Sequence, residues 1–281
     1  MRRWLIEYGG VELTVCAKGD AAEGLVELAL AAIPAEPVAR SHGTKIVVGF
    51  DSESSNWTLL DHTAHVERKL SASGDLIYHL TDRIVFHVAD RAKNVHCLHA
   101  AAVAHNGHAL IVPASSGAGK SSFTTWLAAN GYDYVTDELI LIDAENKLQG
   151  IARPIQIKAH GLEAIDHLIE QSDLVQQGRF ANAVPPASLG ARFDVSGELS
   201  VSMFVFIKFQ KGADFEFERL SSGDAGMRLM ANHVNARSLE GHGFRAMMKL
   251  IRETPCYVLN YGGFDTLPEG FAGELKALLA S

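Results

Sequence analysis

One short segment of the chain has the residue types and spacing of a phosphate-binding loop. Gly119, Lys120 and Ser121 match the end of the pattern G-x-x-x-x-G-K-[ST]. Small residues let backbone N–H groups surround phosphate oxygens, and the N-terminus of the following helix adds positive potential. Lys120 would contact the β- and γ-phosphates of ATP, and the Ser121 hydroxyl would bind Mg²⁺. The expected nucleotide-binding residues are Ser115, Ser116, Gly117, Ala118, Gly119, Lys120, Ser121 and Ser122.

The segment departs from the pattern at its first position, where Ala114 replaces the first glycine. Alanine costs little there if its φ lies in the β region, and it is strained if the loop requires a positive φ. A Gly-Lys-Ser triplet occurs by chance in many loops, so the interpretation depends on the strand pattern before it and the helix pattern after it. The alternative is an ordinary strand–turn–helix unit with a surface lysine.

Two neighbouring carboxylates follow the loop. Asp137 lies 137 − 120 = 17 residues beyond Lys120, at the end of a strand pattern, and Glu138 is next to it. Mg²⁺ in nucleotide sites binds one or two protein carboxylates together with phosphate oxygens. A second carboxylate can accept the proton of a hydroxyl nucleophile. The pair indicates metal binding and proton transfer, and the alternative is an acidic surface turn.

His99 precedes Lys120 by 120 − 99 = 21 residues and lies in a strand pattern. A single histidine near a strand is more often structural than catalytic, so its position alone assigns no role. We do not expect His96, Cys97 and His99 to form a metal site. Adjacent strand residues point to opposite faces, and no second pair of ligands is evident.

Short apolar patterns predict the elements around these residues. Residues 98–104 and 108–112 are two apolar runs joined by Asn106-Gly107. This pair favours a hairpin, because both central residues of a type I′ turn need a positive φ. Residues 123–127 then have the apolar spacing of a helix.

The remaining patterns alternate between strands and helices, which predicts the α/β class with a P-loop nucleotide-binding domain. Residues 1–93 are predicted to form a small α+β N-terminal domain, and residues 94–281 the catalytic domain. Further strands are expected at residues 11–15, 45–50, 57–60, 76–80, 83–88, 132–135, 139–142, 201–209, 215–220 and 256–261, and further helices at residues 22–33, 162–169, 244–251 and 271–279.

A long polar connection is expected from residue 171 to residue 198. Structureless stretches of this length are uncommon in compact domains and are usually lids or disordered segments. This one contains Arg179 and Arg192, two cations that could reach a transferred phosphate. We expect it to be mobile without ligand and to become ordered over the active site when nucleotide and acceptor bind. The alternative is a solvated loop without a catalytic role.

The composition argues against several classes of function. Lysine and arginine number 25 against 33 acidic residues, a formal charge of −8, so binding to nucleic acid or an anionic membrane is not expected. Cys16, Cys97 and Cys256 are widely spaced and form no CxxC pair, as in reduced thiols of a cytoplasmic protein. No segment has the roughly 18 apolar residues of a membrane-spanning helix, and the N-terminus does not have the pattern of a signal peptide.

At these residues the chain resembles the catalytic domain of the HPr kinase/phosphorylase family and its stand-alone homologues. The resemblance extends over residues 94–280 and is most specific between residues 99 and 143. Within that range the histidine, the loop and the sequence Val-Thr-Asp-Glu at 135–138 have the spacing of the family. The resemblance implies an ATP- and Mg²⁺-dependent kinase with the α/β fold of that family.

The resemblance also implies roles for individual residues. In the family the residue matching Asp137 takes the proton from a serine hydroxyl, and the residue matching His99 hydrogen-bonds that acid. The residue matching Glu138 lies near the metal. Asp137 and His99 are therefore the expected catalytic residues, and Ser121 and Glu138 the expected metal-binding residues.

The chain departs from the bifunctional members of the family at two places. Gln156-Ile157-Lys158-Ala159 stands where those enzymes have E-[IV]-R-G, and a V-R-P-G-R segment towards the C-terminus is absent. Those elements are associated with phosphorolysis and with recognition of HPr. The chain is therefore more similar to divergent kinase homologues, some of which phosphorylate a serine of a precursor peptide.

The preferred hypothesis is a kinase that transfers the γ-phosphate of ATP to a serine of a protein or peptide, with a small hydroxyl compound as the alternative acceptor. A nucleotide-dependent switch or ATPase is the second hypothesis, and a nucleotide-binding pseudoenzyme is the third. Stimulation of turnover by an acceptor separates the first two, because a switch hydrolyses ATP slowly whatever acceptor is added. The tendency of the family to assemble is consistent with a homo-oligomer.

Overall fold

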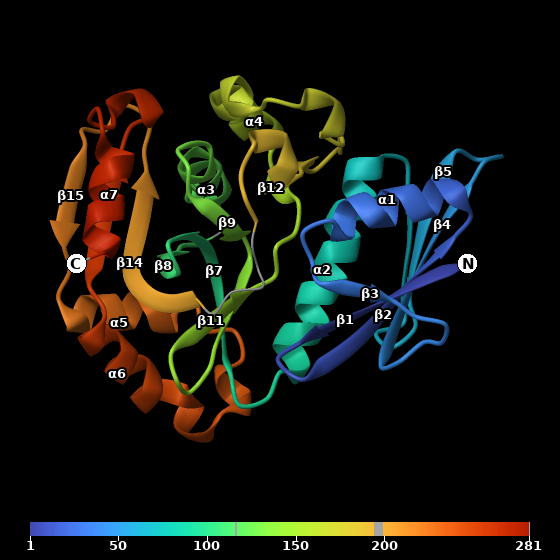
Figure 1. The fold of residues 1–281 in the computed structure, drawn as a ribbon, viewed down its shortest axis with the longest axis horizontal. Helices are drawn as coiled ribbons and strands as arrows, with labels where there is room; N and C mark the ends of the chain where they lie inside the picture. Colours follow the sequence, from blue (N-terminus) through green and yellow to red (C-terminus); the bar gives the residue numbers. More distant parts are fainter. Residues whose placement is uncertain (116, 194–198, 281) are drawn as a thin grey trace. The chain divides into compact units, whose positions relative to one another are not determined.

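The computed structural model describes residues 1–115, 117–193 and 199–280, and the chain forms two compact units (Figure 1). The first unit contains Met1–Lys93 and Ala152–Gly190, and the second contains Asn94–Ile151 and Ala191–Ser281. One crossing between the units coincides with the expected boundary after residue 93. Residues 152–190 differ from the expectation, because they group with the first unit instead of with the residues that flank them.

The second unit is an α/β structure with the strand order β11-β10-β7-β8-β14-β16-β15, and β9 also pairs with β7. Strands β8, β14 and β16 are parallel neighbours, and the other pairs are antiparallel. The strands are β7 (His96–His105), β8 (His108–Pro113), β9 (Asp133–Thr136), β10 (Leu139–Ile142), β11 (Lys147–Gly150), β14 (Leu199–Phe209), β15 (Glu216–Arg219) and β16 (Cys256–Tyr261).

Helices cover both faces of this sheet because the strand side chains alternate between two apolar cores. Ala101, Val103 and Leu110 pack with residues of α3 (Lys120–Ala129) and α7 (Phe271–Leu279). Ala102 and Ile111 face the other way and pack with residues of α5 (Ser222–Met230) and α6 (Phe244–Glu253). The three-layer arrangement confirms the predicted α/β class.

The turn between β7 and β8 has the predicted geometry. Asn106 has a φ of 52° and Gly107 a φ of 80°, so both central residues are left-handed. His105 pairs with His108 across the turn, which gives the two-residue hairpin that the Asn-Gly pair favours. This hairpin fixes the register between β7, which contains His99, and β8, which leads into the loop.

The first unit is built on a sheet with the strand order β3-β1-β2-β4-β5-β6. Its neighbouring strands are antiparallel except β2 and β4, which are parallel. Helix α1 (Asp20–Leu30) lies between β2 and β3 in the sequence and packs on β2 and β4. The strands are β1 (Arg2–Tyr8), β2 (Val11–Lys18), β3 (Ala35–Pro37), β4 (Thr44–Asp51), β5 (Asn56–Asp61) and β6 (Val66–Leu70).

One continuous helix, α2 (Ser73–Arg91), occupies the region where two strands were expected at residues 76–80 and 83–88. That prediction is wrong. Leu76, Leu80, Ile84 and Val88 are buried at intervals of four residues, which is the spacing of a helix face. The β-branched residues of this region favoured strands, but burial of this face against the sheet decides the structure.

Residues 152–190 contain β12 (Ile155–Ile157), α4 (Ala159–Ile165) and β13 (Asn182–Val184), and β12 pairs with β13. The expectation of a structureless connection from residue 171 is therefore wrong for its described part, and residues 194–198 lie outside the described residues. The Asp75 carboxylate accepts a hydrogen bond from the backbone N–H of Arg179 at 2.8 Å. This contact ties the segment to α2 and explains why it groups with the first unit.

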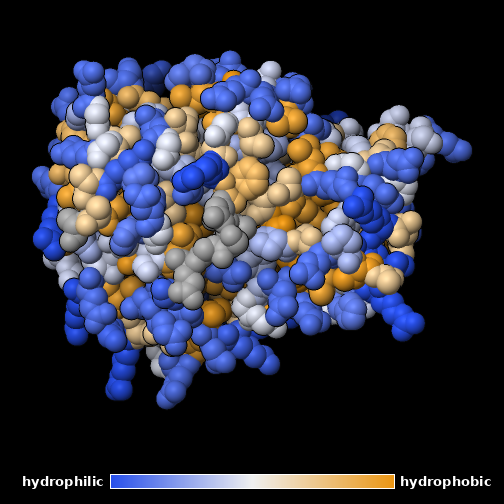
Figure 2. Space-filling model, viewed as in Figure 1, coloured by the Kyte–Doolittle hydropathy of each residue, from blue (hydrophilic) through white to orange (hydrophobic). Residues whose placement is uncertain are grey.

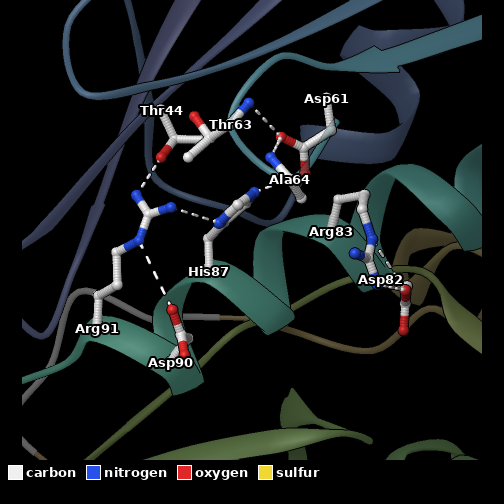
Figure 3. Close-up of polar contacts among 9 residues, drawn as sticks. All are labelled: Thr44, Asp61, Thr63, Ala64, Asp82, Arg83, His87, Asp90 and Arg91. Atoms are coloured by element: carbon white, nitrogen blue, oxygen red, sulfur yellow. Dashed lines mark hydrogen bonds and ion pairs between the residues drawn. The ribbon is translucent and has the colours of Figure 1, made fainter. Parts of the chain in front are cut away.

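A buried polar network joins α2 to β4 and β5 (Figure 3). Nε2 of His87 lies 2.6 Å from Oδ2 of Asp61, and Oδ1 accepts two backbone N–H groups of the following turn at 3.0 Å. Arg91 donates to Nδ1 of His87 at 3.0 Å and to the hydroxyl of Thr44. A guanidinium can only donate, so Nδ1 accepts and the ring has its proton on Nε2, from which it donates to Asp61.

Burial alone would raise the pKa of Asp61. Hydrogen bonds from the backbone of Ala64 and from His87 outweigh that effect and hold the pKa of the carboxyl below its ordinary value. A carboxyl with a lowered pKa stabilises the folded state above the pKa that it has in the unfolded chain. This contribution is lost as the pH falls through the folded-state pKa.

Hydrophilic side chains are spread over the face of the molecule shown in Figure 2. Within the described residues, no helix combines the length and the apolar character needed to cross a membrane.

We predict that Asp61→Asn destabilises the first unit by about 2–4 kcal/mol at pH 7, because it removes the buried carboxylate that accepts hydrogen bonds from His87 and from two backbone N–H groups. Hydrogen exchange of α2 and β5 peptides measures this, and the difference from wild type should shrink as the pH falls below about 4. Asp82→Asn is the control, since its partly exposed pair with Arg83 contributes at most about 1 kcal/mol. Equal protection in the two variants would contradict a stabilising role for the network.

Candidate active site

The predicted phosphate loop joins β8 to α3. Gly117 has a φ of 87° and Gly119 a φ of 91°, a conformation that residues with a side chain rarely adopt. A Cβ on Gly119 would also lie 3.1 Å from the Tyr261 hydroxyl and 3.3 Å from Cβ of Phe209. Both the backbone and the close packing therefore require glycine at position 119. Ser116 lies outside the described residues.

Ala114 fits its position without strain. It is not among the described non-glycine residues with a positive φ. Its side chain is 7% exposed and belongs to the apolar core that α3 covers. The first position of the pattern accepts alanine because a methyl group is buried there and no left-handed backbone is needed.

Lys120, the first residue of α3, is 7% exposed, and its ammonium group lies 2.7 Å from Nε2 of His99. An ammonium group can only donate, so Nε2 accepts and the neutral ring has its proton on Nδ1. Oε1 of Glu138 lies 3.4 Å from the same Nε2. The three side chains form a cluster in which a buried cation has a hydrogen-bond acceptor and a nearby carboxylate.

The turn between β9 and β10 places both acidic residues near this cluster. Leu139 of β10 pairs with His99 of β7, and the N–H of Ala100 donates to the carbonyl of Glu138 at 3.2 Å. The Thr136 hydroxyl donates to the carbonyl of Ile151 at 2.8 Å and accepts the N–H of Glu138 at 3.2 Å. These bonds fix the turn from both sides.

The two carboxylates have different partners. Asp137 is fully buried, and its Oδ2 accepts a hydrogen bond from the Ser121 hydroxyl at 2.9 Å, while the Tyr134 hydroxyl donates to Oδ1 at 3.4 Å. The side chain of Glu138 is 29% exposed and faces His99. The His99–Asp137 hydrogen bond implied by the resemblance is not formed between these described residues. His99 contacts Lys120 and Glu138 instead, because the two acidic side chains leave the turn in different directions.

A second segment supports β7 near His99, and sequence reasoning did not identify it. The N–H of His99 donates to the carbonyl of Asn232 at 2.8 Å, and the Asn235 side chain bonds the backbone of Cys97 at 2.9 Å and of Val95 at 3.0 Å. No local motif marks Asn235, which lies 138 residues from Cys97 along the chain.

Two histidines pack together beside this segment. Nδ1 of His96 lies 3.3 Å from Nε2 of His233. Burial, with a contribution from His96, lowers the pKa of His233 to about 4, so the pair stays neutral at neutral pH. Their part is to fill the space under Gly243, where a Cβ would lie less than 3 Å from both rings.

The two arginines expected near the transferred phosphate have different positions. Arg192 pairs with Asp133 at 2.9 Å, and its carbonyl accepts the N–H of Tyr134 at 2.7 Å. Arg179 belongs to the first unit and has an exposed side chain. The pairing of Arg192 ties residues 191–193 to β9, the strand that leads to Asp137.

Within the described part of the chain, no group of three or more His, Cys, Asp and Glu side chains is placed to hold a metal ion. Mg²⁺ in nucleotide sites needs no such group, because phosphate oxygens and water complete its shell. Ser121 and Asp137 provide a hydroxyl and a carboxylate oxygen 2.9 Å apart, a donor set that fits Mg²⁺.

Comparison of the chain with models of protein families gives no match, and comparison with curated proteins gives none.

Proposed function

We propose that the chain is an ATP-dependent kinase with an HPr-kinase-like P-loop domain, which transfers the γ-phosphate to a hydroxyl acceptor. One observation supports this most strongly. Lys120 and Ser121 are the first residues of a helix that follows a glycine in the left-handed conformation. The Lys120 ammonium contacts His99, which lies beside Glu138 of the acidic turn. The Ser121 hydroxyl donates a hydrogen bond to Asp137 of the same turn. A surface lysine on an ordinary turn would be solvated, whereas Lys120 is buried against His99.

In this proposal the loop holds the donor. The first N–H groups of α3 have no intrahelical partner, and with the helix dipole they attract phosphate oxygens. The ammonium of Lys120 turns from His99 towards the β- and γ-phosphates. Ser121, with a carboxylate of the turn, would hold Mg²⁺, which neutralises charge on the phosphates when bound.

The transfer step needs one proton acceptor. The acceptor oxygen forms a bond to the γ-phosphorus while the bond from that phosphorus to the bridging oxygen of ADP breaks. The hydroxyl proton passes to the Asp137 carboxylate, which already accepts a hydrogen bond from one serine hydroxyl. His99 acts through Lys120 and Glu138 as a positioning residue. Most of the rate would come from positioning and charge stabilisation.

The contact between Asp137 and Ser121 also suits the opposite assignment, in which Asp137 and Glu138 exchange the roles of proton acceptor and Mg²⁺ ligand. Asp137 would then lie in the Mg²⁺ shell together with Ser121. Glu138, which is more exposed and lies beside His99, would accept the proton. The two assignments predict opposite kinetic effects for the two acids.

Three features are expectations for this kinase. The acceptor is a serine of a protein or peptide, with a small hydroxyl compound as the alternative. The protein is expected to be cytoplasmic, and neither nucleic acid nor a membrane is an expected partner. Assembly into a homo-oligomer is consistent with the resemblance.

We predict that Lys120→Ala removes most phosphoryl transfer, because the β- and γ-phosphates lose their cation. The measurement is mass spectrometry of products after incubation with ATP, Mg²⁺ and a library of serine-containing peptides. Lys249→Ala is the control, since that lysine is 72% exposed on α6. Circular dichroism should show that both variants are folded. Undiminished transfer by Lys120→Ala would show that the segment does not act as a P-loop. Formation of ADP without any phosphorylated product would favour the nucleotide-dependent switch or ATPase.

We predict that Asp137→Asn lowers the transfer rate by roughly 10²–10⁴, the usual contribution of a general base, while ATP affinity changes by only a few-fold. Glu138→Gln should instead weaken the dependence of the rate on Mg²⁺. The measurement is single-turnover kinetics at several Mg²⁺ concentrations. If Asp137→Asn shows the altered Mg²⁺ dependence and Glu138→Gln the loss of rate, the opposite assignment holds.

A further inference from the structure

The order of the strands determines the direction in which a nucleotide held by the loop would extend across the sheet. β8 leads into the phosphate loop. His99 on β7 and the acidic turn between β9 and β10 lie on one side of β8 in the sheet, whereas β14 and β16 lie on the other. The γ-phosphate must face the carboxylates. The remainder of the nucleotide therefore extends towards the ends of β14 and β16.

Two aromatic residues end these strands beside the loop. Phe209 is the last residue of β14 and Tyr261 the last residue of β16, and they are register partners with ring centroids 5.6 Å apart. Both lie against Gly119, the residue before Lys120. They point to the same face of the sheet as α3, because Val205 and Ile207 on the same strand parity belong to the core under that helix.

Part of the Phe209 side chain is exposed to solvent, and the Tyr261 hydroxyl has no hydrogen-bond partner among the described residues. Phe209 is 46% exposed although it is a large apolar side chain. The Tyr261 residue is 2% exposed overall, and its hydroxyl lies at the loop, beside Gly119. Its burial raises the pKa of the phenol, so the hydroxyl stays protonated and can donate. The Tyr261 hydroxyl is not one of the buried polar atoms that lack a partner, so it is accessible beside Gly119, where a ligand oxygen can accept its hydrogen.

We propose that Phe209 and Tyr261 form the base-side part of the nucleotide site. The Phe209 ring stacks on the nucleobase, and the Tyr261 hydroxyl donates to a phosphate oxygen next to Gly119. This inference rests on the proposed function and adds the residues that recognise the nucleoside. Stacking on a phenyl ring is tolerant of base identity, so contact with Phe209 does not distinguish one nucleobase from another.

The test compares ATP with inorganic tripolyphosphate, which has the same phosphate chain and no base. Isothermal titration calorimetry with Mg²⁺ measures both affinities for the full chain. Phe209→Ala should weaken ATP binding by about 5- to 100-fold, the usual effect of losing one base–aromatic stack, and leave tripolyphosphate affinity within twofold. Phe209→Trp should restore ATP binding. Tyr261→Phe should weaken both ligands equally, by about tenfold, as expected for a lost hydrogen bond to a charged group.

The control is Phe244→Ala, which removes a similarly exposed phenyl ring (54%) on α6, the helix that covers the opposite face of the sheet. It should leave both affinities unchanged. The subsite is refuted if Phe209→Ala behaves like Phe244→Ala, or if it weakens ATP and tripolyphosphate equally. If the wild-type protein binds neither ligand, the proposed function fails together with the subsite. Binding of both ligands by wild type without an effect of Phe209→Ala refutes the subsite alone.

Discussion

The hydrogen bond between the buried ammonium of Lys120 and the imidazole of His99 is the interaction on which the rest of the site depends. A buried cation is tolerated only with acceptors and opposite charge around it. His99 provides the acceptor at 2.7 Å, and the Glu138 carboxylate lies beside the same nitrogen. These side chains come from α3, β7 and the turn before β10, so the cluster forms only when all three elements are in register. The β7–β8 hairpin and the pairing of β10 with β7 provide that register.

Small residues let these elements approach one another. Ala101 of β7 is buried on the face of the sheet that α3 covers, and α3 packs directly on this strand. Gly119 accepts the phenol of Tyr261 and the side chain of Phe209 at distances that leave no room for a side chain. The same close packing that positions Lys120 over β7 thus places two aromatic residues at the far side of the loop. In the proposed kinase, phosphoryl transfer and recognition of the nucleoside are therefore divided between the two sides of β8.

Much of the second unit follows from local sequence, because its elements have strong signals. The Asn106-Gly107 turn, β10 and β16 have the predicted positions, and α3 begins at the lysine of the loop. The prediction of strands at residues 76–80 and 83–88 is wrong, because β-branched residues favour strands there and the helical spacing becomes decisive only when the sheet under α2 is known.

Local sequence patterns do not predict which side chains contact one another at the turn between β9 and β10. The sequence places His99, Asp137 and Glu138 together, but not which acid faces the histidine, since that depends on how the turn is held by Thr136. The support of β7 by Asn235 joins residues far apart in the chain and has no local signature. The grouping of residues 152–190 with the first unit likewise depends on hydrogen bonds to α2, which local sequence patterns do not predict.

In the proposed kinase, Lys120 leaves His99 for the phosphates of ATP, and ¹⁵N NMR of the histidine rings can detect this change of partner. The signals of His99 can be assigned with His99→Gln. Without nucleotide, His99 should have the tautomer with the proton on Nδ1 and an unprotonated, hydrogen-bonded Nε2. At saturating ATP and Mg²⁺ its Nε2 signal should shift, because the ammonium now donates to phosphate, while the signals of His105 at the far end of β7 stay in place. An Nε2 signal of His99 that is unchanged by saturating ATP and Mg²⁺ would show that Lys120 does not exchange His99 for the phosphates.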